Sequence, residues 1–365
     1  MKILLINHQI MPEASGVASH FDTLSKVLLV LGHEVERMVV EDDQFKKQNK
    51  NIGYHYFKHI KKDLLSTKKK SAERIKQNRI FFKNALKKIN LKEIDRVIAS
   101  NDVYVSILKE FINPANILPI IPSSLAFSKE TNPDDYQKII ERMKKNLKNI
   151  KTVVLSQKMK FMISDFLGKN YDISVVYPGV SLERFSKKPQ FEKKDNRVIY
   201  VGRIAAEKNI PDLLQAVGQT ASNCSLTIVG TGEQLKEVKN IAKNLPKEKK
   251  IIFKGKKKRV EKYYSQGKIF VLPSKSEAFG LVILEAMASG LPVIAFKPSK
   301  IFMTASDEII SNGIDGFLVE DVSEMSEKID LLLKDNKLRI KMSKNALHKA
   351  KLFSWTNHAN SLLAL

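Results

Sequence analysis

The sequence predicts an α/β protein built from two Rossmann-like units, each with a doubly wound parallel sheet. Three observations support this. Short apolar segments alternate with helical patterns along most of the chain, as in successive βα units. The 365 residues, 43% hydrophobic and 28% charged, fit two soluble domains of ordinary size. A polar stretch at 186–196 separates the alternation into two series.

The first series begins with the apolar segment KILLIN at 2–7, which we interpret as a strand. A helical pattern follows from about Val17 to Leu31, and Gly32 provides a stop signal. The segment 32–40 then predicts a second strand. Further strands are expected at 94–100, 115–121 and 151–156.

The second series has the same alternation after the linker. Its expected strands are 197–203, 225–233, 250–255, 268–274 and 291–296. Ligands of such sheets bind beyond the carboxyl ends of the strands. The candidate site residues are therefore the polar and glycine-rich residues that follow each strand: Ser15-Gly16, Gly202-Arg203, 230–232, Gly255 and 274–280.

Composition excludes several classes of protein. Cys224 is the only cysteine, so no internal disulfide can form. No apolar run approaches the roughly 20 residues that span a bilayer. The apolar start is too short for a secretory signal, so we expect a cytoplasmic protein. The net charge of +24 indicates either a solvated Lys-rich surface or attraction to an anionic partner.

The stretch VGRIAAEKN at 201–209 places two cations at a strand end. Arg203 and Lys208 lie five positions apart, just before a predicted helix. A forked guanidinium and a flexible ammonium can hold a diphosphate between them. The alternative is that both are surface cations and that one of them pairs with Glu207.

The stretch SEAFGLVILEAM surrounds a helix start with two carboxylates. Glu277 lies in a predicted loop, and the helix begins near Gly280. Unpaired N–H groups at a helix start suit a phosphate, and glycine permits close backbone approach. Glu285 lies inside the helix and would need a partner such as ribose hydroxyls, unless it faces solvent.

Two further glycine turns carry weaker signals. SLTIVGTGE places Gly230 after a strand, but the chain lacks the full G-x-G-x-x-G fingerprint, so we infer no NAD site. Gly16 lies between the first strand and the first helix. It is either a phosphate-approach position or a plain βα turn.

Taken together, these motifs resemble those of the GT-B glycosyltransferases, and most closely the retaining nucleotide-sugar family (family 4, glycosyl transferases group 1). The pattern there is Gly-Gly after the first strand, G-R-x4-K opening the second domain, and E-x7-E near its end. Here these are Ser15-Gly16, Gly202-Arg203 with Lys208, and Glu277 with Glu285. GHEV at 32–35, YPGVSLERF at 177–185 and PSKSEAFG at 273–280 also agree.

The resemblance implies two domains facing a central cleft. The expected ranges are 1–180 for the acceptor domain and 181–350 for the nucleotide-sugar domain. A helix at about 351–365 would cross back onto the first domain. It further implies a hexosyltransferase that uses a UDP- or GDP-sugar, retains anomeric configuration and needs no metal or other cofactor. The acceptor would be a hydroxyl of a glycan, a glycolipid or a lipid-linked molecule.

The resemblance also implies roles for individual residues. Arg203 and Lys208 would neutralise the donor diphosphate, Glu277 would hold the donor sugar, and Glu285 the ribose. We predict Arg203, Lys208 and Glu277 as catalytic. The predicted donor-binding residues are Gly16, Gly202, Gly230, Ala278, Phe279, Gly280, Leu281 and Glu285.

The chain departs from the family pattern in three places. Ser15 replaces the first glycine of the pair. Pro122 to Ser124 occupy the place where many relatives carry a histidine. The stretch 297–310 lacks the usual glycine pair before an acidic residue. Donor-sugar identity is therefore left open. His20 falls on the first helix, where we interpret it as a structural residue.

Basic charge is concentrated near the N-terminus. Between Lys46 and Lys92 there are sixteen Lys/Arg, opposed by Asp63 and Glu73. Within 54–89 they alternate with apolar residues at roughly helical spacing. Two interpretations stay open: a peripheral helix on an anionic membrane at its inner face, or a core helix with a solvated face. No nucleic-acid motif accompanies the charge, so no nucleic-acid partner is expected.

Two other functions are alternatives to this one. One is a different GT-B enzyme, such as a nucleotide-sugar epimerase or a phosphorylase, and the G-R-x4-K and E-x7-E motifs oppose it. The other is a non-enzymatic basic scaffold or nucleic-acid binder with a degenerate fold. This second alternative is disfavoured because all four motif residues are present: Arg203, Lys208, Glu277 and Glu285.

Overall fold

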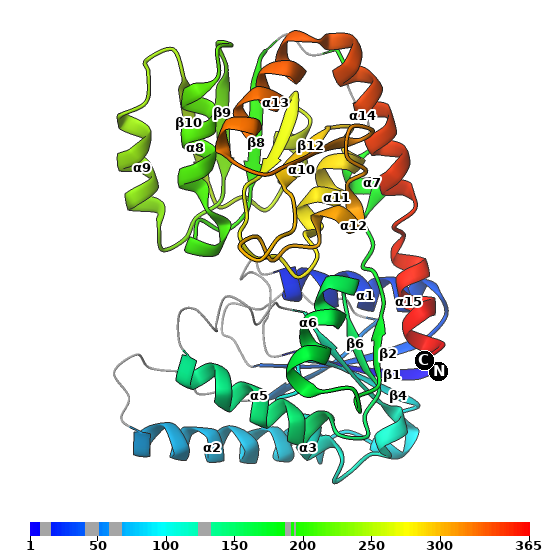
Figure 1. Ribbon diagram of the computed structural model, residues 1–365. Helices are drawn as coiled ribbons and strands as arrows, with labels where there is room; N and C mark the ends of the chain where they lie inside the picture. The colour runs from blue at the N-terminus through cyan, green and yellow to red at the C-terminus, as the bar shows by residue number, and fades with distance from the viewer. Residues whose placement is uncertain (8–15, 41–50, 58–67, 123–132, 187–190, 193–194) are drawn as a thin grey trace.

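The computed structural model describes residues 1–7, 16–40, 51–57, 68–122, 133–186, 191–192 and 195–365. Two lobes, each built on its own sheet, are stacked one above the other (Figure 1). The first sheet has seven strands in the order β3-β2-β1-β4-β5-β6-β7, and the second has six in the order β10-β9-β8-β11-β12-β13. All the strand pairs are parallel. The predicted α/β class with two Rossmann-like units is confirmed.

The first lobe contains the N-terminal half of the chain. Its strands are β1 (Lys2–Asn7), β2 (Glu34–Val40), β3 (Gly53–Phe57), β4 (Arg96–Ser100), β5 (Ile117–Ile121), β6 (Thr152–Val154) and β7 (Ile173–Val175). The helices described there are α1 (Gly16–Val30), α2 (Lys68–Leu86), α3 (Val105–Leu108), α5 (Pro133–Leu147) and α6 (Gln157–Leu167).

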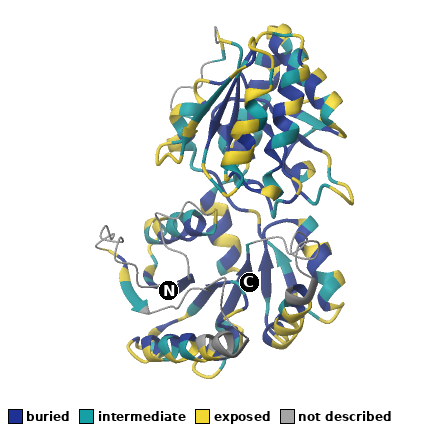
Figure 2. Cartoon of the chain, turned by 90° about the vertical axis from the view of Figure 1, so that its left-hand side faces the viewer, coloured by how far each residue is buried: buried dark blue, intermediate teal, exposed yellow. Residues whose placement is uncertain are grey.

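The second lobe repeats the alternation. Its strands are β8 (Arg197–Val201), β9 (Ser225–Val229), β10 (Lys250–Gly255), β11 (Ile269–Leu272), β12 (Val293–Phe296) and β13 (Gly316–Val319). Its helices are α7 (Leu182–Phe185), α8 (Ile210–Gln219), α9 (Leu235–Lys243), α10 (Glu261–Tyr264), α11 (Leu281–Ala288), α12 (Ser306–Ile309), α13 (Val322–Lys334) and α14 (Asn336–Lys351). Strands β8, β9, β11 and β12 are largely buried between helices whose outer faces are exposed (Figure 2), whereas the edge strand β10 has no buried residue.

The predicted continuous helical pattern over 54–89 is wrong at its start. Residues Gly53–Phe57 form β3, which pairs with β2. The rings of Tyr54 and Tyr56 stack on one face with their centroids 6.3 Å apart. Aromatic residues suit a pleated strand, and pairing with β2 prevails over the mixed spacing. The strands β7 and β13 were also missed, because each is only three or four residues long.

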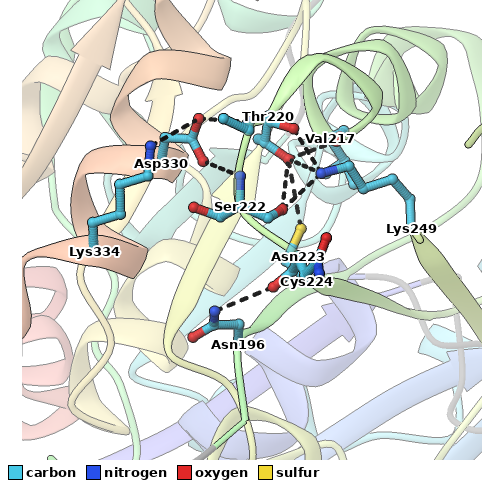
Figure 3. Close-up of polar contacts among 10 residues, drawn as sticks. Asn196, Val217, Thr220, Ser222, Asn223, Cys224, Lys249, Asp330 and Lys334 are labelled. Carbon is cyan, nitrogen blue, oxygen red and sulfur yellow. Dashed lines mark hydrogen bonds and ion pairs between the residues drawn. The ribbon is translucent and has the colours of Figure 1, made fainter.

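A buried lysine fixes the connection between α8 and β9 (Figure 3). Lys249 Nζ donates to Thr220 O at 2.6 Å, Thr220 Oγ1 at 2.8 Å and Ser222 O at 2.6 Å. The Asp330 carboxylate accepts from the amides of Ala221 and Ser222. Burial raises the pKa of the neighbouring Cys224 thiol. These contacts satisfy buried polar groups, so we assign this cluster a structural role.

The chain returns to the first lobe at its end, where α15 (Trp355–Leu363) packs on α1 (Figure 1). His358 Nδ1 lies 2.9 Å from Tyr177 O, and His358 Nε2 lies 3.0 Å from His20 Nε2. The carbonyl requires a proton on His358 Nδ1, so His358 Nε2 accepts from His20. The Trp355 ring packs edge-on against His20 at 5.1 Å. His20 is buried in this contact, as expected of a structural residue.

We expect the His20–His358 contact to make stability depend on pH. Burial lowers the pKa of both imidazoles, that of His358 to about 4, whereas the unfolded value is about 6.5. Below pH 6.5 the unfolded chain therefore binds protons that the folded chain excludes. The contribution of His358 is complete above pH 6.5 and falls by about 1.4 kcal/mol per pH unit toward pH 4.

Urea unfolding at pH 7 and pH 5 measures this effect. The wild type should lose about 2 kcal/mol more than His358→Gln over this interval. His348→Gln, at an exposed histidine of α14, should behave as the wild type does. Equal losses in all three proteins would show that the pair is not responsible.

Candidate functional site

The two lobes meet where strands of both sheets end. Ser156 lies two residues after β6 in the first lobe, and Ala278 lies six residues after β11 in the second. The Ser156 hydroxyl donates to Ala278 O at 2.6 Å. The carboxyl ends of these strands therefore face one another across the junction, which is where ligands of parallel α/β sheets bind.

Two of the predicted glycines, Gly202 and Gly230, lie in contact in the loops that follow β8 and β9. Gly202 N donates to Val229 O at 3.0 Å. A Cβ atom on Gly230 would lie 1.8 Å from Gly202 O, so only glycine fits there. The backbones of the loops after β8 and β9 therefore pack closely against each other. Arg203, the residue after Gly202, lies in the first of these two loops.

Among the described residues, Arg203 forms ion pairs with two glutamates. Its guanidinium pairs with Glu207 and lies 3.7 Å from Glu233 Oε1, and its side chain is 58% exposed. The pairing with Glu207 is the one that the surface-cation alternative anticipated. The Arg203 side of this pair is open to solvent, although Glu207 is only 13% exposed, so the guanidinium is accessible to an anionic ligand.

Lys208 and Glu277 meet directly, although they are 69 positions apart in the sequence. Lys208 Nζ lies 2.7 Å from Glu277 Oε1, and the same oxygen accepts from Ser274 Oγ at 2.9 Å. Both side chains are less than 20% exposed. The tertiary fold thus joins the G-R-x4-K motif to the first carboxylate of E-x7-E.

The helix predicted after Gly280 is present as α11. Gly280 has a φ of +98°, a conformation that favours glycine. The predicted donor-binding Phe279 side chain is buried against Tyr177 and Phe353, so Phe279 could contact a ligand only through its backbone. Leu281, the first residue of α11, is half-buried.

Glu285 does not face solvent freely. It is half-buried, and its Oε2 accepts from the Tyr264 hydroxyl at 2.9 Å. Burial raises its pKa to about 7, although the Tyr264 hydrogen bond opposes the shift. The expected partner of this carboxylate is therefore supplied, at least in part, by a tyrosine of α10 that the sequence analysis missed.

Residues 182–349, which include α7 to α14 almost entirely and every site residue from Gly202 to Glu285, match the family described as glycosyl transferases group 1. These residues are just under half of the chain, and over them the chain is similar to that family.

Solved glycosyltransferase structures share the fold of the whole chain. Sucrose-phosphate synthase from Thermosynechococcus elongatus has a TM-score of 0.82 and 21% identity, with 100% of this chain and 97% of that chain covered. Anabaena HepE, solved with UDP and glucose, has a TM-score of 0.78 and 16% identity, with 100% and 98% covered. The predicted GT-B fold is confirmed.

Curated relatives match over a shorter part. An uncharacterised glycosyltransferase of Haemophilus influenzae is 32% identical over 198 residues, which are 53% of this chain and 54% of that protein. N-acetyl-alpha-D-glucosaminyl L-malate synthase of Bacillus anthracis is 29% identical over 189 residues, 48% of each chain. The chain spans about half the length of these relatives.

The fold does not test some of the predictions made from the sequence. Among the described residues, no atom would lie within 4 Å of a Cβ atom on Gly16, so they give no packing reason for glycine there. Ser15 and residues 123–124 lie outside the described residues.

Within the described ranges, no three or more His, Cys, Asp or Glu side chains gather as a metal site would require. Metal independence stays a prediction, as do the domain limits.

Sequence reasoning missed three polar residues near the site, Tyr264, Ser156 and Glu308, and gave Ser274 no specific role. Ser274 and Tyr264 bind the two motif carboxylates, and Ser156 and Glu308 join the lobes. Ser274 lies within the candidate stretch 274–280, but its bond to Glu277 was not predicted. The other three carry no local signal, because their partners lie at least 21 positions away.

Proposed function

We propose that the chain is a retaining hexosyltransferase that moves a sugar from a UDP- or GDP-sugar to a hydroxyl of a glycan, glycolipid or lipid-linked acceptor. The observation that carries this proposal is the meeting of Lys208 with Glu277, beside Arg203 and the start of α11. The residues involved follow the neighbouring strands β8 and β11, and they supply two cations, one carboxylate and the backbone amides of a helix start.

The comparisons support a nucleotide-sugar donor. HepE was solved with UDP and glucose, and one TarM variant with UDP, a glycan and a GlcNAc-glycerol. WaaG is described as a glycosyltransferase of lipopolysaccharide biosynthesis. Within this proposal, the donor of the present chain is a sugar joined to a nucleoside diphosphate, and its acceptor is a carbohydrate or lipid-linked hydroxyl.

The proposed chemistry depends on stabilising the leaving diphosphate. Arg203 and Lys208 would exchange their carboxylate partners for phosphate oxygens, and the α11 amides would add hydrogen bonds. Glu277, released from Lys208, would accept hydrogen bonds from the sugar, while Glu285 would hold the ribose. Retention follows if the acceptor attacks the face that the diphosphate leaves and a phosphate oxygen takes its proton. Because cations stabilise the diphosphate, we propose that no metal is needed.

We further propose that the protein works in the cytoplasm, with the basic segment 46–92 contacting anionic head groups at the inner face of the membrane. None of the described helices is both long and apolar enough to cross a bilayer. Phe82, Ala85 and Leu86 of α2 are buried in the lobe, while Lys76 and Arg79 are exposed. In this part of α2 the apolar face belongs to the core, so the contact we propose is electrostatic.

A thermal-shift screen tests the proposed function. The protein is melted with UDP, GDP, ADP, TDP or CMP and with their common sugar conjugates. We expect one base to raise the melting temperature, since a ligand at 100 times its Kd stabilises the folded state by about 2.7 kcal/mol. Lys208→Ala should reduce the shift, and Lys243→Ala, exposed at the end of α9, should keep it. Binding of RNA without any nucleotide shift would favour a non-enzymatic scaffold.

A further inference from the structure

A carboxylate of the second lobe binds the start of a helix in the first. Glu308 lies in the short helix α12. Its Oε2 accepts from Gln157 N at 2.7 Å, and its Oε1 accepts from Lys158 N at 2.7 Å. The Tyr177 hydroxyl, on the segment that leads from β7 to α7, donates to Glu308 Oε2 at 3.0 Å.

Helix α6 is therefore capped from both lobes. Its own Ser156 accepts from Met159 N at 3.1 Å, in the usual manner of a serine cap. The amides of Gln157 and Lys158 are bonded to Glu308 instead. A carboxylate at a helix N-terminus also interacts favourably with the helix dipole. If the lobes separated, these two amides would lose their partner and turn to water.

The contacts between the lobes also include the loop that carries Glu277. Ser156 is fully buried, and besides capping α6 it donates to Ala278 O at 2.6 Å. On its other side the loop is bonded to the segment before α12, since Glu277 N donates to Met303 O at 3.1 Å and Met303 N donates to Lys275 O at 2.7 Å. The loop is thus held between α6 and the chain leading to Glu308.

We propose that Glu308 and Ser156 are positioning residues, which lock helix α6 of the first lobe against the Glu277 loop in the arrangement needed for sugar transfer. Neither residue touches the reacting atoms in this proposal. Glu308 fixes the start of α6 relative to the second lobe. Ser156, at the start of α6, then holds Ala278, the residue next to Glu277, through its hydrogen bond. The catalytic part of this inference rests on the proposed function, whereas the junction itself does not.

Hydrogen exchange measured by mass spectrometry tests the junction without an activity assay. Glu308→Gln keeps the size of the side chain but replaces one acceptor oxygen with an NH2 group, which cannot accept. We expect exchange in peptides that cover 157–159 to become about 10-fold faster or more, which is 1.4 kcal/mol of lost protection. Asp307→Asn is the matched control, because it removes the same charge from an exposed neighbour on α12. Its exchange should equal that of the wild type.

Steady-state kinetics with the donor that the thermal-shift screen identifies test the positioning role. Glu308→Gln should lower kcat about 10-fold or more, with the donor Kd within twofold of the wild type. Tyr177→Phe, which removes only one donor to Glu308, should give a smaller loss of the same kind. Unchanged exchange at 157–159, or a kcat equal to that of Asp307→Asn, would overturn the proposal. If the wild type transfers no sugar, the proposed function fails while the exchange result still decides the junction.

Discussion

Replacing Lys208 with alanine is expected to lower the turnover number for sugar transfer by about 100-fold or more. This is the scale of removing one preorganised group that stabilises charge in a transition state. Lys208 Nζ is held 2.7 Å from Glu277 and is only 19% exposed, so its position is fixed before a ligand arrives. An ammonium in such a place needs little reorganisation to meet a leaving diphosphate. Arg203→Ala should cause a loss of similar size.

The measurement is kcat with the identified donor, together with the melting temperature of each variant. Lys208→Met separates charge from packing, because it keeps most of the aliphatic stem without the ammonium. It should be as inactive as the alanine variant while folding normally. Lys243→Ala controls for general loss of positive charge. Near-normal kcat in both Arg203→Ala and Lys208→Ala would refute the roles assigned to these two cations.

Replacing Gly230 with alanine is expected to destabilise the fold by about 3 kcal/mol. The new Cβ would lie 1.8 Å from Gly202 O, a backbone atom that cannot rotate away, and the φ of Gly230 is +154°. The loops after β8 and β9 would have to separate. Because Arg203 directly follows Gly202, moving this loop would also move the guanidinium that we propose binds the diphosphate. The variant should therefore also bind the donor more weakly.

Urea unfolding at pH 7 measures this loss of stability. Gly16→Ala is the control, since a Cβ there would meet no atom of the described residues within 4 Å and no positive φ is found at Gly16. Its free energy of unfolding should stay within about 0.5 kcal/mol of the wild type. If Gly230→Ala were equally neutral, the tight contact between the two loops would be contradicted.

The difference between the two lobes shows how far local pattern predicts structure. In the second lobe five of the six strands were predicted, because each is an apolar run bounded by glycine or polar residues. In the first lobe β3 was placed in a helical pattern. Its residues carry mixed polar and aromatic side chains, and its strand conformation depends on pairing with β2. Local propensity is weak wherever tertiary pairing supplies most of the free energy.

The sequence by itself determined the α/β class, the two-unit organisation and the candidate motifs, because hydrophobic period and glycine spacing are local properties of the chain. Only the tertiary structure decided which of these residues meet. It brings Lys208 into contact with Glu277, and Tyr264 into contact with Glu285. It also places Glu308 at the start of α6, 150 positions away. Such contacts depend on how whole elements pack, and no local spacing records that arrangement.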